Sequence, residues 1–131
     1  MNHYDVAVIG GGAAGLSAAL VFSRARRKVL VVDAGSPRNA PATRMHGYLS
    51  RDGMPPAELL AVGREEVRRY GGDIAAGTVT DLVRDGHGFT VVLTSGDRIS
   101  ARRVLVTTCL RDEPPGTPGP RDRWALSLIH I

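Results

Sequence analysis

The chain has 131 residues, of which 43% are hydrophobic and 23% are charged, as is typical of one folded globular domain. Its net charge of +4 does not indicate nucleic-acid binding, because the arginines are scattered along the sequence and only 5% of the residues are aromatic. No apolar run approaches the roughly 20 residues of a membrane span, so we expect a cytoplasmic protein without a membrane partner. Cys109 is the only cysteine, which excludes a disulfide within these residues and a cysteine metal site.

The N-terminal residues predict a strand, a helix and a second strand. Residues 4–10, YDVAVIG, are apolar and β-branched, which indicates a strand buried on both faces of a parallel sheet. Residues 11–15 form a glycine-rich turn, and the small, helix-favouring residues 13–26 predict a helix that packs closely on the sheet. Residues 28–33, KVLVVD, predict the next strand. Two such strands joined by a helix form a right-handed βαβ unit.

A long loop and a second helix follow. Residues 34–54 are rich in Gly, Pro, Asn and Ser, and loops of this length in a compact domain are usually functional. Pro55 and Pro56 favour the start of a helix, which Gly71 and Gly72 end.

The remaining pattern predicts short strands. They cover residues 74–76, 78–83, 89–93 and 98–100 and are separated by glycine turns, so we expect a β-meander. Residues 103–107, RVLVT, predict a buried strand that returns to the parallel sheet. The expected fold class is α/β, a Rossmann-like parallel sheet with a β-meander.

The glycine turn carries the chemistry. Gly10, Gly12 and Gly15 permit, in that order, a tight turn, the approach of a pyrophosphate to the backbone and close packing of helix on strand. Asp33 ends the second strand 18 residues after Gly15, where its carboxylate can accept hydrogen bonds from a ribose and would repel the 2′-phosphate of NADP. The pattern predicts a dinucleotide site. The alternative is a glycine-rich turn followed by an exposed aspartate.

Four segments resemble the thioredoxin reductase-like flavoproteins, class II of the pyridine nucleotide-disulfide oxidoreductases. The segments are YDVAVIGGGAAGLSAAL, VVDAGSPRNAP, HGYLSRDG and ARRVLVTTCLRDE, and the likeness covers residues 4 to about 124. The resemblance implies an oxidoreductase that passes electrons from NAD(P)H through FAD to a small-molecule or protein disulfide or dithiol. It also implies a homodimer in the full-length form, with residues 1–125 as the N-terminal part of an FAD-binding domain.

The resemblance also implies which residues contact FAD. The glycines would hold the pyrophosphate and Asp33 the adenosine ribose. Arg38 and Asn39 would lie in the loop beside the flavin, with His46 near its ring, and Val79 would approach the adenine through its backbone. The alternative for the three loop residues is that they stabilise the loop itself. The full set is Gly10, Gly12, Ala13, Ala14, Gly15, Asp33, Ala34, Arg38, Asn39, His46, Val79, Thr107 and Thr108.

One turn departs from the family pattern. Thr107, Thr108 and Cys109 stand where the family has Ala-Thr-Gly near the flavin, so a side chain replaces the usual glycine. We expect Cys109 to act as a small buried hydrophobe rather than as a redox cysteine. No catalytic residue and no metal site are predicted.

The C-terminal residues indicate a truncation. The family continues with a second nucleotide-binding domain and a Cys-x-x-Cys pair, so we expect this fragment to be inactive alone. Residues 126–131, LSLIHI, depart from the family, and the codons CTG TCT CTT ATA CAC ATC, which encode them, match a transposase sequencing adaptor. We therefore expect a non-native tail. Alternatives to a thioredoxin reductase-like enzyme are the start of a flavin monooxygenase or amine oxidase, and a non-catalytic dinucleotide-binding module.

Overall fold

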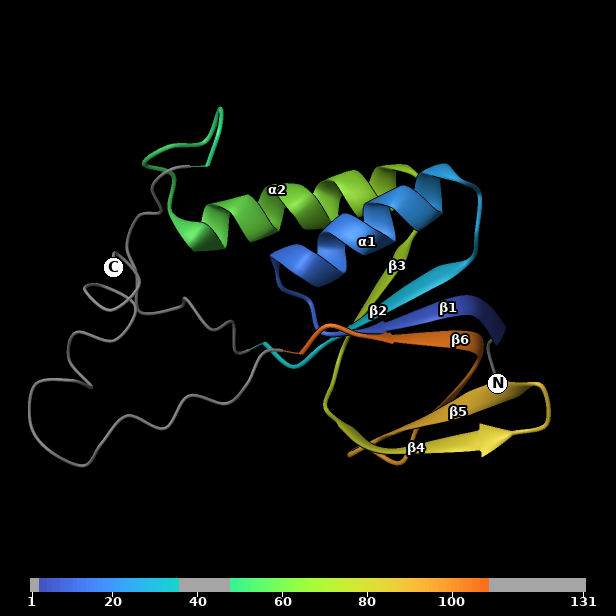
Figure 1. Cartoon of the computed structure of the whole chain (residues 1–131). Coiled ribbons are helices and arrows are strands. Elements are labelled where there is room, and N and C mark those ends of the chain that lie inside the picture. Colours follow the sequence, from blue (N-terminus) through green and yellow to red (C-terminus); the bar gives the residue numbers. More distant parts are fainter. Residues whose placement is uncertain (1–2, 36–47, 109–131) are drawn as a thin grey trace, which may run out of the picture.

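The computed structural model describes residues 3–35 and 48–108. Within these ranges the chain forms six strands and two helices (Figure 1), and the predicted α/β fold class is confirmed. In chain order they are β1 (His3–Ile9), α1 (Ala13–Arg24), β2 (Val29–Asp33), α2 (Pro56–Arg69), β3 (Asp73–Ala76), β4 (Val79–Asp85), β5 (Gly88–Leu93) and β6 (Arg98–Val106).

The strands form one mixed sheet in the order β3-β2-β1-β6-β5-β4. The pairs β3–β2, β2–β1 and β1–β6 are parallel, whereas β6–β5 and β5–β4 are antiparallel. Because β1 and β2 are parallel neighbours joined through α1, the predicted βαβ unit is present.

Strands β1 and β2 are buried on both faces, as the sequence predicts for residues 4–10. In Figure 1 the two helices lie over one face of these strands, and β4 and β5 lie on the opposite side. The core on the helix side contains Val6, Val8, Leu16, Ala19, Val29, Val31, Leu60 and Val67. The core on the other side contains Tyr4, Ala7, Ile9, Leu30, Val32, Val91, Leu93, Ile99 and Ala101. Successive residues of β2 thus alternate between two cores.

Both helices bury one side and expose the other. Helix α1 has 12 residues and buries Leu16 and Ala19, and α2 has 14 residues and buries Leu60 and Val67. Neither helix in the described ranges has the length and apolarity that a bilayer crossing requires.

The strand pairing differs from the expected meander at two places. The strand at 74–76 does not join the meander, because β3 pairs in parallel with β2 and continues the parallel layer. The segments 98–100 and 103–107 are not separate strands. They form the single strand β6, which pairs with β5 through its first part and with β1 through most of its length. The expectation of a buried strand at residues 103–107 is wrong, because Arg103, Leu105 and Val106 are exposed. Arg102 and Arg103 also interrupt the apolar pattern there.

One edge of strand β6 is only partly paired among the described strands. Its pairing with β5 covers residues 98–101, whereas its pairing with β1 covers residues 100–106. Among the strands that the structure describes, none pairs with the second edge of residues 102–106. Leu105 and Val106 in this segment are 37% and 59% exposed.

Val31→Ala tests the helix-side core. Val31 is fully buried between β2 and the helices, so we expect its truncation to lower the free energy of unfolding by about 2–3 kcal/mol. The matched control is Val83→Ala, because Val83 is 45% exposed on β4 and the same truncation there should cost less than about 1 kcal/mol. Urea denaturation followed by circular dichroism measures both, and equal losses would contradict this description of the core.

Candidate dinucleotide-binding site

The glycine turn lies at the carboxyl ends of the parallel strands. It joins the end of β1 to the start of α1, and β1 stands between β2 and β6 in the sheet. The chain leaves β1 toward β2 on one side, and β6 lies on the other side, so the strand order changes direction at this point. Ligands of open α/β sheets bind in the crevice at such a switch point.

Gly10 has a conformation and surroundings that only glycine fits. Its φ is +117°, and its N–H donates to the carbonyl oxygen of Val32 at 2.9 Å. A Cβ at residue 10 would lie 2.8 Å from Oγ1 of Thr107. The positive φ and this close approach together explain the glycine, as the motif predicts for a tight turn.

Gly15 and Gly12 differ in what surrounds them. A Cβ at residue 15 would collide with the carbonyl oxygen of Gly10, so Gly15 permits the close packing of α1 on β1. A Cβ at residue 12 would meet no atom of the described residues within 4 Å. The packing of the described residues therefore gives no reason for a glycine at position 12, and the space beside it is open.

The start of α1 is left without a side-chain cap. Gly12 is the N-cap residue and offers no side-chain cap, and the first turn contains no acidic residue. Ala13 and Ala14, the first two residues of the helix, are exposed. The positive end of the helix dipole is therefore available to an anion in the open space beside Gly12.

Asp33 lies beside the same turn. It is half-buried at the end of β2, and its Oδ1 accepts a hydrogen bond from the N–H of Gly35 at 2.9 Å. A Cβ at Gly11 would collide with the Asp33 carboxyl carbon, so the two residues are in close contact. The motif does not constrain Gly11, and only the fold shows why a glycine is needed there. Ala34, the next residue, is exposed.

Thr107 connects the end of β6 to the glycine turn. Its backbone N–H donates to the carbonyl oxygen of Ile9 at 2.9 Å. Its hydroxyl lies 3.0 Å from the same oxygen and 3.2 Å from the carbonyl oxygen of Gly10, so the hydroxyl hydrogen can be shared between them. Thr107 thus holds the turn in place, and the exposed Thr108 follows it.

Val79 follows a segment that is hydrogen-bonded to the end of β2 at Asp33. The N–H of Gly77 donates to the backbone carbonyl oxygen of Asp33 at 2.9 Å, and β4 begins at Val79 two residues later. The Val79 side chain packs against the core on the sheet face opposite the helices. Its backbone is therefore the part that remains for a ligand.

Several predictions lie outside the described residues. They concern Arg38, Asn39, His46, Cys109 and the tail at 126–131. Within residues 3–35 and 48–108, no group of three or more His, Cys, Asp or Glu side chains could hold a metal ion.

The sequence matches one protein family and many curated proteins. The family is described as pyridine nucleotide-disulphide oxidoreductase, and the match covers residues 4–129. One relative is the thioredoxin reductase tcpT of Claviceps purpurea, which is 34% identical over 137 residues. That match covers 98% of this chain and 41% of the relative.

Solved structures show the same fold. The crystal structure of HlmI has a TM-score of 0.90 and 54% identity, and the match covers 95% of this chain and 40% of that one. The oxidoreductase from Agrobacterium tumefaciens has a TM-score of 0.87 and 41% identity, with 96% and 43% covered. The chain thus spans about two fifths of the length of the proteins it matches.

Alanine substitutions at Gly15 and Gly12 test whether a methyl group is excluded at the first position and accommodated at the second. We expect Gly15→Ala to lower the free energy of unfolding by at least about 2 kcal/mol, because the new methyl group collides with the Gly10 carbonyl. We expect Gly12→Ala to cost less than about 1 kcal/mol, because the methyl group meets no atom. Thermal unfolding of the purified variants measures both values. A larger loss for Gly12→Ala than for Gly15→Ala would show that the turn has a different geometry.

Proposed function

We propose that this chain, which belongs to the pyridine nucleotide-disulphide oxidoreductase family, forms the N-terminal part of an FAD-binding domain. Residues 1–125 would make up this part, and residues 126–131 would be foreign to it. The observation that carries the proposal is the open space at Gly12, which lies between an uncapped helix start and the contact of Asp33 with Gly11. A diphosphate and an adjoining ribose are the groups that fit these two features.

The residues of the turn would bind the two halves of the cofactor differently. The backbone N–H groups of residues 12–15 would donate to the pyrophosphate, and the missing side chain at Gly12 would let it approach. The Asp33 carboxylate would accept hydrogen bonds from the ribose hydroxyls of the adenosine, beside Ala34. When bound, FAD supplies an acceptor for a hydride and a carrier for electrons.

Other contacts in the proposal are carried over from the family resemblance. Thr107 and Thr108 would lie near the flavin, and Val79 would approach the adenine through its backbone. The position of Thr107 against Gly10 supports its place beside the turn. Arg38, Asn39 and His46 would complete the set.

For the whole protein we propose an oxidoreductase of the thioredoxin reductase-like type. Electrons would pass from NAD(P)H through FAD to a disulfide or dithiol substrate, in a cytoplasmic homodimer. The relatives described as thioredoxin reductases favour this over a flavin monooxygenase or an amine oxidase, which begin with the same βαβ fingerprint. A non-catalytic dinucleotide-binding module is the alternative from a different class, and reductase activity of a longer form would exclude it.

FAD binding by the purified chain tests the site. We expect a visible flavin spectrum that stays with the protein, and its loss in Gly12→Val, because the branched side chain would fill the space for the pyrophosphate. Asp33→Ala should weaken binding by about 1.5–3 kcal/mol, the value of a hydrogen bond to a charged group. Glu65→Ala on the exposed side of α2 is the matched control, because it removes the same charge away from the turn. Unchanged affinity in Asp33→Ala would exclude the ribose role.

The isolated chain should not reduce disulfides. Its single cysteine cannot form an internal pair, and no second glycine fingerprint of this kind follows the first in the 131 residues. We therefore expect no NADPH oxidation when the FAD-loaded chain is mixed with a disulfide. Steady oxidation under these conditions would show that a second fingerprint and a cysteine pair are not required for turnover.

A further inference from the structure

An open basin lies at the end of the sheet opposite the glycine turn. Its volume is about 950 Å³, and it is formed by the start of β1, the turn between β4 and β5, and the middle of β6. His3 pairs with Ser100 at one end of the β1–β6 ladder, and Ile9 pairs with Val106 at the other end. Six residues of strand separate these ends by roughly 20 Å. The basin is therefore separate from the proposed FAD site.

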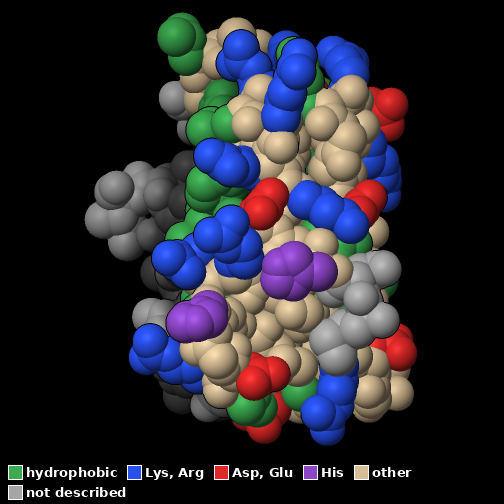
Figure 2. Space-filling model, turned by 90° about the vertical axis from the view of Figure 1, so that its right-hand side faces the viewer, with side chains coloured by type: hydrophobic (Ala, Val, Ile, Leu, Met, Phe, Trp, Pro, Cys, Tyr) green, Lys and Arg blue, Asp and Glu red, His purple; other side chains and the backbone are tan. Residues whose placement is uncertain are grey.

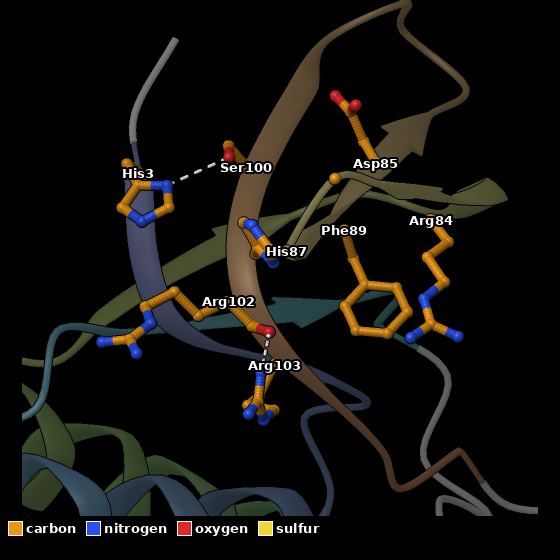
Figure 3. Close-up of a pocket in the computed structure, with 10 residues that line it drawn as sticks. His3, Arg84, Asp85, His87, Phe89, Ser100, Arg102 and Arg103 are labelled. Carbon is orange, nitrogen blue, oxygen red and sulfur yellow. Dashed lines mark hydrogen bonds between the residues drawn. The ribbon is translucent and has the colours of Figure 1, made fainter.

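Cationic and polar side chains surround this basin. Figure 3 shows Arg102 and Arg103 with the rings of His3 and His87 around the open space, and Arg84 and Phe89 on its other side. The three arginines and both histidines are exposed. Figure 2 views the molecule from this side, where Lys, Arg and His side chains gather.

The charge of these arginines is not neutralised by the protein around them. Within the part of the chain that the structure describes, no carboxylate forms an ion pair with Arg84, Arg102 or Arg103. Asp85 is the acidic residue of the basin, and Figure 3 shows its carboxylate directed away from Arg102 and Arg103. Within the described residues, no ion pair therefore offsets the positive charge of these two adjacent arginines.

Two hydrogen bonds fix the position of side chains at the rim. Nδ1 of His3 lies 3.0 Å from Oγ of Ser100, which ties the ring of His3 on β1 to β6. Nη1 of Arg103 donates to the carbonyl oxygen of Arg102 at 2.9 Å. One of its N–H groups is thus used, and the remaining N–H groups of that guanidinium can reach a ligand.

We propose that this basin binds a multiply charged oxyanion of the phosphate type. Guanidinium groups pair with phosphate oxygens through two parallel hydrogen bonds, and imidazole rings add further N–H donors. The phosphate is either free or the end of a larger molecule such as a nucleotide, for which the half-buried ring of Phe89 offers a stacking surface. The proposal goes beyond the FAD site and does not depend on it.

Titration with inorganic pyrophosphate tests the proposal. The ring resonances of His3 and His87 report on the basin, and the backbone amides of Gly11 and Gly12 report separately on the glycine turn. We expect saturable shifts of both histidine rings. The histidine signals are assigned from His3→Gln and His87→Gln.

Variants of β6 compare arginines that line the basin with one that does not. We expect the double variant Arg102→Gln, Arg103→Gln to weaken binding at the histidines about tenfold or more. Arg98→Gln is the matched control for Arg102→Gln, because Arg98 is exposed on the same strand but does not line the basin. Its effect should stay below about twofold, since an exposed charge at that distance is largely screened. If the double variant loses its amide dispersion and is therefore unfolded, His87→Gln serves as a second variant. His87 lies in the turn between β4 and β5, so its replacement leaves the strands intact.

The source of the phosphate is distinguished by comparing pyrophosphate with ADP. Equal affinity indicates a free anion, whereas tighter ADP binding with shifts of the Phe89 ring indicates a nucleotide. Binding weaker than about 10 mM for both probes would overturn the proposal. Equal weakening by Arg98→Gln and Arg102→Gln would also overturn it, because only the overall charge would then matter. FAD binding should be unchanged in Arg102→Gln, so failure here is separate from failure of the proposed function.

Discussion

Helix α1 begins so close to strand β1 that residue 15 has no room for a side chain. This contact between Gly15 and the Gly10 carbonyl fixes where the helix starts, and therefore where its free N–H groups lie. Thr107 holds the same carbonyl from the other side, through the end of β6. The remaining features of the turn follow from this geometry, because the open space at Gly12 exists only while the helix stays pressed against the strand.

The parallel topology also places positively charged side chains at the end of the sheet opposite the glycine turn. Both helices run from the glycine-turn end to the other end, and their last turns carry Arg24, Arg68 and Arg69. Cations at helix C-termini complement the helix dipole, and Arg24 also lies over the ring of Tyr70 with 5.9 Å to the centroid. Arginines that are scattered in the sequence thus gather at one end of the fold. The charge of this end is a consequence of chain direction as much as of composition.

The local features of the fold could be predicted, and the features that join distant segments could not. The βαβ unit follows from apolar runs and glycine spacing, so the role of Gly15 in packing was predictable. The parallel partner of β3 was not, because four residues carry too little pattern to choose a neighbour. The same limit explains the missed contact of Gly11 with Asp33, since the pattern leaves residue 11 free. The hydrogen bonds of Thr107 to the glycine turn depend on a pairing between segments almost a hundred positions apart. The basin likewise joins three segments that only the sheet order brings together.

The open edge of β6 bears on the order in which such a domain can assemble. The strands and helix that shape the glycine turn all come before residue 107, and β1 already holds β6 in register. A further strand could pair with residues 102–106 without moving any of them, because the edge faces away from β1. In a longer protein, this part of the fold would therefore be able to form before later segments were synthesised. Among the described strands, none covers this edge beside the exposed Leu105 and Val106, and such an edge is a place where two chains can associate.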